Sequence, residues 1–152
     1  MKRQAIYLDV RADTDEHPGQ VAARVGRALD CTFAEGEHLG WYAQIAHVFG
    51  LKLVLVGRAG IGGKNVIKVT SQLAEADFLR TPDGNGRFEQ DRVDISPYIT
   101  VLLTLRTGLL WYQPTAEDRA AENKAASRFD DFLGGVGTDS WTSDDEERFG
   151  DW

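Results

Sequence analysis

The chain has 152 residues, of which 42% are hydrophobic and 27% charged, and its formal net charge is -7. These values are typical of one folded domain and not of a disordered chain. The single cysteine, Cys31, excludes an intramolecular disulfide, a zinc ribbon and a CxxC redox pair, and it favours a reducing compartment. The acidic balance argues against direct nucleic-acid binding, which needs a basic surface, and favours a basic partner.

The hydropathy pattern predicts a cytoplasmic protein without membrane contact. The apolar run that follows Lys2 and Arg3 is interrupted within a few residues, too soon for a signal peptide. No stretch of the sequence approaches the roughly 20 apolar residues that are needed to cross a bilayer.

The first half of the chain predicts two strands and two helices. Apolar and polar residues alternate over residues 4–10, which is the period of a half-buried strand. Residues 18–30 predict an amphipathic helix, because a proline suits the first helical turn and the apolar residues after it share one face. A short strand is expected at residues 32–35. The apolar residues of 41–49 have helical spacing and predict a short helix that Gly50 closes.

Two hairpins and two further helices are predicted in the second half. Residues 51–56 form a near-continuous apolar run, typical of a strand covered on both faces, and residues 66–70 predict its hairpin partner. A dense turn signal at residues 82–86 predicts the second hairpin. The helix predicted over residues 98–106 is apolar nearly all round, so it should be largely buried. A further strand and a final helix, which ends at Leu133, complete the pattern.

The order of these elements mixes alternating units with hairpins, which favours the α+β class over a doubly wound parallel sheet. We expect a single domain, a mixed β-sheet with hairpins and about four packed helices. Residues 1–135 are expected to form this globular α+β domain, and residues 136–152 an acidic, aromatic C-terminal tail. Because the predicted elements end by Leu133, the fold is expected to survive removal of the tail.

The glycine-rich connection from Gly57 to Lys64 resembles a phosphate-binding loop only superficially. The nucleotide-binding pattern GxxxxGK[ST] has glycine where this chain has Arg58, and Ser or Thr where it has Asn65. The β-branched residues from Val66 onward predict a strand where that pattern needs a helix. We therefore expect no nucleotide or other cofactor here, although Arg58 and Lys64 are candidates for contact with an acidic or phosphate group of a partner.

Glu35, Glu37 and His38 are the best candidates for catalytic chemistry, because closely spaced carboxylates push their pKa values apart. Asp9 would join them if the sheet brought it near. The segment lacks the i, i+4 histidine spacing of a helical zinc site. A solvated loop is therefore the favoured interpretation, and neither a metal site nor a catalytic residue is predicted.

The end of the chain concentrates acidic and aromatic residues. Residues 139–152 contain six acids and one base, so they carry -5 of the net charge of -7. Acidic side chains steer a basic partner, whereas large aromatic side chains are the usual buried anchors of interfaces. The predicted partner-binding residues of the tail are Trp141, Asp144, Asp145, Glu146, Glu147, Phe149 and Trp152.

These features favour a non-catalytic protein that binds another macromolecule, with a basic protein as the expected partner. An immunity or antitoxin-type inhibitor of a bacterial toxin is one concrete version of this hypothesis. The excess of arginine over lysine, twelve to five, is typical of a GC-rich bacterial or phage genome. Two alternatives stay open: a small enzyme that uses Asp9, Glu35, Glu37 and His38, and a phage or bacterial structural assembly subunit.

Overall fold

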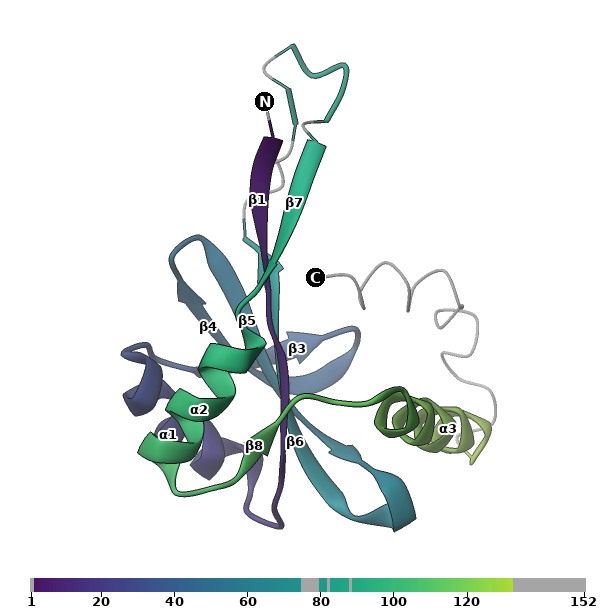
Figure 1. Cartoon of the computed structure of the whole chain (residues 1–152). Helices are drawn as coiled ribbons and strands as arrows, with labels where there is room; N and C mark the ends of the chain where they lie inside the picture. Colours follow the sequence, from purple (N-terminus) through teal and green to yellow (C-terminus); the bar gives the residue numbers. More distant parts are fainter. Residues whose placement is uncertain (1, 75–79, 82, 88, 133–152) are drawn as a thin grey trace.

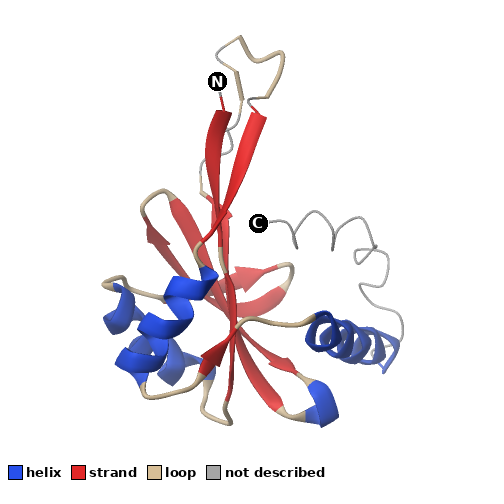
Figure 2. Cartoon of the chain, viewed as in Figure 1, coloured by secondary structure: helices blue, strands red, loops and turns tan. Residues whose placement is uncertain are grey.

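The computed structural model describes residues 2–74, 80–81, 83–87 and 89–132, and it shows an α+β fold (Figures 1 and 2). Its strands are β1 (Lys2–Tyr7), β2 (Asp9–Asp13), β3 (Ala34–His38), β4 (Trp41–Val48), β5 (Leu51–Ala59), β6 (Asn65–Leu73), β7 (Glu89–Asp94) and β8 (Trp111–Tyr112). Its helices are α1 (Pro18–Leu29), the short 3-10 helix η1 (Ile61–Gly63), α2 (Ser96–Thr107) and α3 (Ala116–Phe132). The α+β class is confirmed, but two details of the prediction are not. The described residues form three α-helices and not about four, and their parallel strands form a small separate sheet and not part of one mixed sheet.

Six strands form an antiparallel sheet in the order β3-β4-β5-β6-β2-β8, and β1 and β7 form a separate parallel pair. Helices α1 and α2 pack side by side on one side of the large sheet, and α3 lies apart from them (Figure 1). The main core fills the space between α1, α2 and the sheet. Its largest fully buried apolar side chains are Leu8, Val10, Val21, Val25, Leu53, Leu55, Val69 and Leu103.

Helix α1 forms as the sequence predicts, and local capping fixes both of its ends. His17 precedes the helix, and its Nδ1 accepts a hydrogen bond of 3.0 Å from the backbone N–H of Gly19. Asp30 ends the helix in the left-handed conformation, with φ 60, and its backbone N–H bonds to the carbonyl of Gly26. Such caps satisfy backbone groups that a helix end leaves unpaired.

The helix predicted over residues 41–49 is wrong, because this segment is strand β4. Leu39-Gly40 and Phe49-Gly50 all have positive φ, so each dipeptide forms the two-residue turn of a hairpin. These turns pair β4 with β3 and with β5. Both faces of β4 are partly covered, and Gln44 is buried with a 2.6 Å bond from its Nε2 to the Tyr42 hydroxyl. A strand that is covered on both faces does not show the strict alternation of apolar and polar residues that identifies a half-buried strand.

The first strand also differs from its prediction, since Leu8 separates β1 from β2 and each belongs to a different sheet. β1 pairs in parallel with β7, a pairing that was not predicted from the sequence.

The structure agrees more closely with the two predicted hairpins. β5 pairs with β6 around the glycine-rich connection, as predicted. An isolated antiparallel bridge between Arg80 and Arg87 flanks the turn at residues 82–86, although part of this second hairpin lies outside the described residues.

Helix α2 is not largely buried as its composition predicts. Its inner face buries Ile99 and Leu103 against α1 and the sheet. The outer face exposes three apolar side chains, with Tyr98 68%, Val101 60% and Leu105 78% accessible to solvent. A helix that is apolar all round normally has a neighbour on each side. The described residues supply that neighbour on one side only.

Candidate functional site

The face of the large sheet opposite α1 and α2 carries a row of cations. Side chains alternate between the faces of a strand, so residues paired directly across antiparallel strands share a face. Arg11 of β2 pairs with Lys68 of β6, and Lys68 pairs with Val56 of β5. Arg58 follows Val56 by two residues and therefore points to the same face. Three neighbouring strands thus contribute one cation each.

Helix α3 places the carboxylate of Glu122 among these three cations. Its Oε2 lies 3.1 Å from Arg11 Nη2, and its Oε1 lies 3.0 Å from Lys68 Nζ and 3.7 Å from Arg58 Nε. The side chains of Glu122 and Arg11 are 12% and 3% exposed. Glu122 is therefore a largely buried anion held by groups from three strands.

The start of α3 is fixed by a reciprocal cap between Thr115 and Asp118. The backbone N–H of Thr115 donates to Asp118 Oδ2 at 2.9 Å, and the backbone N–H of Asp118 donates to Thr115 Oγ1 at 3.2 Å. This is the arrangement of a capping box, with aspartate in place of the usual glutamate. The cap sets where the helix begins and hence which face of it carries Glu122.

Asp9 adds a second buried carboxylate to the same face. Its Oδ1 lies 3.2 Å from Arg11 Nη1, and its Oδ2 accepts a 3.2 Å hydrogen bond from Arg119 Nη2 of α3. The contact with Arg11 is close but poorly aligned, so Asp9 Oδ1 and Arg11 Nη1 have no hydrogen-bond partner among the described residues. We call Asp9, Arg11, Arg58, Lys68, Arg119 and Glu122 together the charge cluster.

Positive charge is in excess in the charge cluster, with four cations against two carboxylates. Arg11 and Lys68 stand directly opposite each other, a pairing of like charges that destabilises a sheet unless an anion lies between them. Burial lowers the pKa of Lys68, and Arg11 lowers it further. Burial raises the pKa of Glu122, but Lys68 and Arg11 outweigh this effect, so the carboxyl titrates below its ordinary value. Glu122 thus reduces the electrostatic repulsion among Arg11, Arg58 and Lys68.

Burial and two cations of the charge cluster lower the pKa of His38 on β3. Burial lowers its pKa to about 4, and the charges of Lys52, Arg58 and Lys68 contribute to the shift. The imidazole is therefore neutral at physiological pH. A neutral histidine can accept a proton, but the surrounding cations disfavour the charged product.

The structure does not bring together the four residues of the enzyme alternative. β3 and β2 are separated by three strands, and four steps of about 4.8 Å place them about 19 Å apart. Glu35 and Glu37 alternate with His38 along β3, and Glu35 interacts with the Tyr42 hydroxyl at 3.4 Å on the face towards α1. Asp9 instead belongs to the charge cluster.

The predicted partner-binding cations of the glycine-rich connection both have partners within the chain. Arg58 is part of the charge cluster, and Lys64 Nζ forms a 2.8 Å ion pair with Asp13 Oδ2. The remaining predicted partner-binding residues lie outside the described residues: Trp141, Asp144, Asp145, Glu146, Glu147, Phe149 and Trp152. Their assignment stays a prediction.

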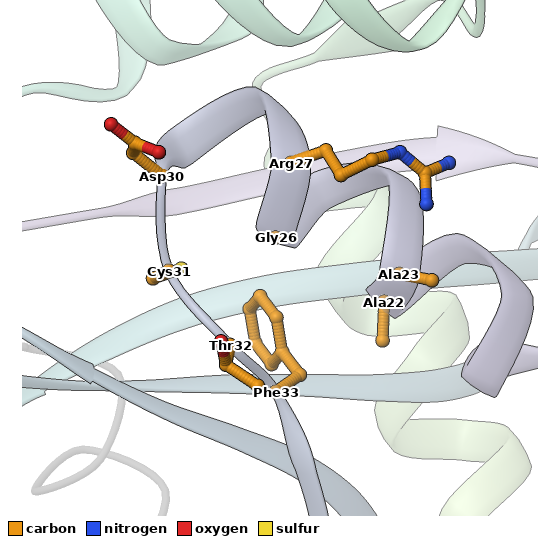
Figure 3. A pocket seen from close by; sticks show the side chains of 8 residues that line it. All are labelled: Ala22, Ala23, Gly26, Arg27, Asp30, Cys31, Thr32 and Phe33. Atoms are coloured by element: carbon orange, nitrogen blue, oxygen red, sulfur yellow. The ribbon is translucent and has the colours of Figure 1, made fainter.

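A separate hollow of about 440 Å³ lies beside the C-terminal end of α1 (Figure 3). Arg27, Asp30, Cys31 and Phe33 line it together with small residues of the helix. Burial raises the pKa of the Cys31 thiol, and Asp30 raises it further, so the reactive thiolate is disfavoured. The hollow is large enough for a small molecule, but its two charged side chains, Arg27 and Asp30, point away from each other (Figure 3). Those of the charge cluster instead surround one carboxylate.

Comparison of the chain with protein-family models, with curated proteins and with solved structures found no match. Within the described residues, no group of three or more His, Cys, Asp or Glu side chains is placed to hold a metal ion. In the same part of the chain, every helix is too short or too polar to span a bilayer.

Arg58 and Asp9 were candidates from the sequence alone, whereas the other members of the charge cluster were not. Arg11 stands between Val10 and Ala12, and Lys68 between Ile67 and Val69. A charged residue inside an apolar strand needs a partner on its face of the sheet. That signal was available, whereas the identity of the partner, Glu122, depended on the packing of α3.

Proposed function

We propose that this protein binds another macromolecule and that the apolar outer face of α2 is part of its contact surface. The observation that carries the proposal is the row of Tyr98, Val101 and Leu105, which are spaced i, i+3 and i+7 and all more than half exposed. We call these three residues the α2 stripe. Apolar side chains exposed together on one face, unlike scattered single ones, are typical of an interaction site.

The proposed partner is a basic protein that presents an apolar surface to α2. The charge of the chain supports this choice, because residues 139–152 carry -5 of the net charge of -7. Opposite charge accelerates encounter, and apolar anchors then slow dissociation. An immunity or antitoxin-type inhibitor of a basic bacterial toxin is the concrete form that we favour.

Affinity capture with quantitative mass spectrometry tests this proposal. We expect Leu105→Glu to lower recovery of the partner from native cell extract at least tenfold, which corresponds to about 1.4 kcal/mol. The reason is loss of an apolar contact, since an added negative charge does not repel a basic protein. The matched control is Phe49→Glu on the β4–β5 turn, where the side chain is 97% exposed.

The two variants carry the same added charge, so their comparison isolates the α2 stripe. Recovery should stay at the wild-type level for Phe49→Glu.

Replacement of Asp144, Asp145, Glu146 and Glu147 by Asn and Gln should slow association with the partner and make the association rate less dependent on salt concentration. Equal recovery with Leu105→Glu and with Phe49→Glu would place the interface away from α2.

A second candidate function, that of a structural assembly subunit, is favoured by the β1–β7 ribbon. This parallel pair extends beyond the large sheet, and no further strand of the described residues pairs with it (Figure 1). Parallel strands are usually covered on both faces, and an isolated two-stranded pair is marginally stable. Light scattering separates the candidates, because an assembly subunit has a mass that rises with concentration in the absence of any partner.

A further inference from the structure

We propose that Arg11, Arg58 and Lys68 form a binding site for the phosphate group of a small molecule, and that Glu122 of α3 occupies this site in the absence of ligand. The site lies on the face of the sheet opposite α1 and α2, so it is distinct from the proposed contact surface on α2.

The geometry around Glu122 is that of a bound anion. Two guanidinium groups and one ammonium group, all from different strands, surround a single carboxylate within 3.0 to 3.7 Å. Arginine presents a fork of N–H donors that fits carboxylate and phosphate oxygens equally well. The strand register fixes the backbone positions of all three donors independently of α3.

The balance of charge favours phosphate over carboxylate as the external ligand. Asp9 forms ion pairs with both Arg119 and Arg11. Within the charge cluster, four cations therefore share two carboxylates, which leaves an excess of two positive charges among these described residues. A phosphate monoester carries about -1.5 to -2 at pH 7 and offers three acceptor oxygens. It therefore neutralises the site more completely than Glu122 does.

Arg11 has unused capacity to donate to such a ligand. Its side chain is 3% exposed, and its buried Nη1 lies 3.2 Å from Asp9 Oδ1 but makes no well-formed hydrogen bond among the described residues. A buried guanidinium nitrogen without a well-formed hydrogen bond is costly. The third oxygen of a phosphate group supplies an acceptor that the two oxygens of Glu122 do not.

The described part of α3 is attached in a way that allows replacement by a ligand. Its contacts include the ion pairs of Glu122 and Arg119 with the large sheet and a 3.1 Å hydrogen bond from Arg119 to the Tyr7 hydroxyl of β1. The cavity between α3 and the sheet, whose charged lining residues are Arg11, Arg58, Asp118 and Glu122, is only about 10 Å³. That is room for a single water molecule at most, so phosphate must displace the Glu122 side chain.

Titration of the full chain with inorganic phosphate tests this inference. Glu122→Gln removes the competing carboxylate, so we expect it to bind phosphate at least tenfold more tightly than the wild type. Lys68→Met should weaken binding at least tenfold in either background. The matched control is Glu117→Gln, which removes one negative charge from an exposed position of the same helix and should leave the affinity unchanged.

Binding is measured by the thermal shift and by the Nε–H resonances of Arg11 and Arg58, with sodium chloride at equal ionic strength as the reference. If Glu122→Gln unfolds in chloride, phosphate is expected to restore its fold, whereas chloride is not. Sodium acetate tests whether a simple carboxylate suffices, and acetate binding as tight as phosphate binding would overturn the choice of ligand. A shift that is the same in phosphate and chloride, or the same for Glu122→Gln and Glu117→Gln, would refute the site.

Discussion

Leu103→Ala is expected to lower the free energy of unfolding by about 3 kcal/mol, within the range of 2–5 kcal/mol for buried leucines. Leu103 is fully buried between α2 and the sheet, so its truncation removes apolar contacts and leaves a cavity. Urea denaturation followed by circular dichroism measures the change.

Leu105→Ala on the same helix provides the control, because the Leu105 side chain is 78% exposed. Its effect on the free energy of unfolding should stay within about 0.5 kcal/mol. A large loss of stability from both variants would mean that the outer face of α2 is covered within the chain. The α2 stripe would then be a core feature and not a contact surface.

Glu122→Gln is expected to destabilise the protein by about 3 kcal/mol at neutral pH, because three neighbouring cations lose their shared anion. Lys68→Met should change stability by less than about 1 kcal/mol, since it removes the like charge opposite Arg11 and leaves Glu122 paired. Loss of the anion is expected to cost more stability than loss of one cation, because positive charge is in excess in the charge cluster. A larger effect of Lys68→Met than of Glu122→Gln would contradict it.

The pH dependence of these variants provides a check with a definite sign. The pKa of Glu122 in the folded protein lies below the ordinary value of 4.5, so its contribution is complete above that value. The contribution is lost as the pH falls through the folded pKa, because the protonated carboxyl resembles glutamine. The difference in stability between the wild type and Glu122→Gln should therefore shrink in acid.

Local sequence signals predicted those parts of the fold that local chemistry determines. The first turn with Pro18 and the helical spacing after it identified α1, and the apolar run from Leu51 identified β5. A helix was predicted over residues 41–49 because their apolar residues have helical spacing and Gly50 suits the end of a helix, whereas the segment is strand β4. Gly50 is the second position of a hairpin turn, and the earlier Leu39-Gly40 pair repeats that pattern ten residues before.

The charge cluster could be predicted only in part, because its members are distant in sequence. Arg11, Lys68 and Glu122 are separated by about fifty residues each and meet through strand register and the docking of α3. The parallel pairing of β1 with β7 had no local signal for the same reason. Sequence alone marks a charge inside an apolar strand, whereas the identity of its partner requires the tertiary structure.

Hydroxyl-radical footprinting of the full chain tests the proposed macromolecular contact most directly. The chain is oxidised in buffer and in extract of its native cells, and the modification of Tyr98, Leu105 and Phe49 is quantified by mass spectrometry. The proposal predicts that Tyr98 and Leu105 are protected several-fold in the extract, while Phe49 is oxidised to the same degree in both. Equal oxidation of Tyr98 and Leu105 in buffer and in extract would contradict binding through α2.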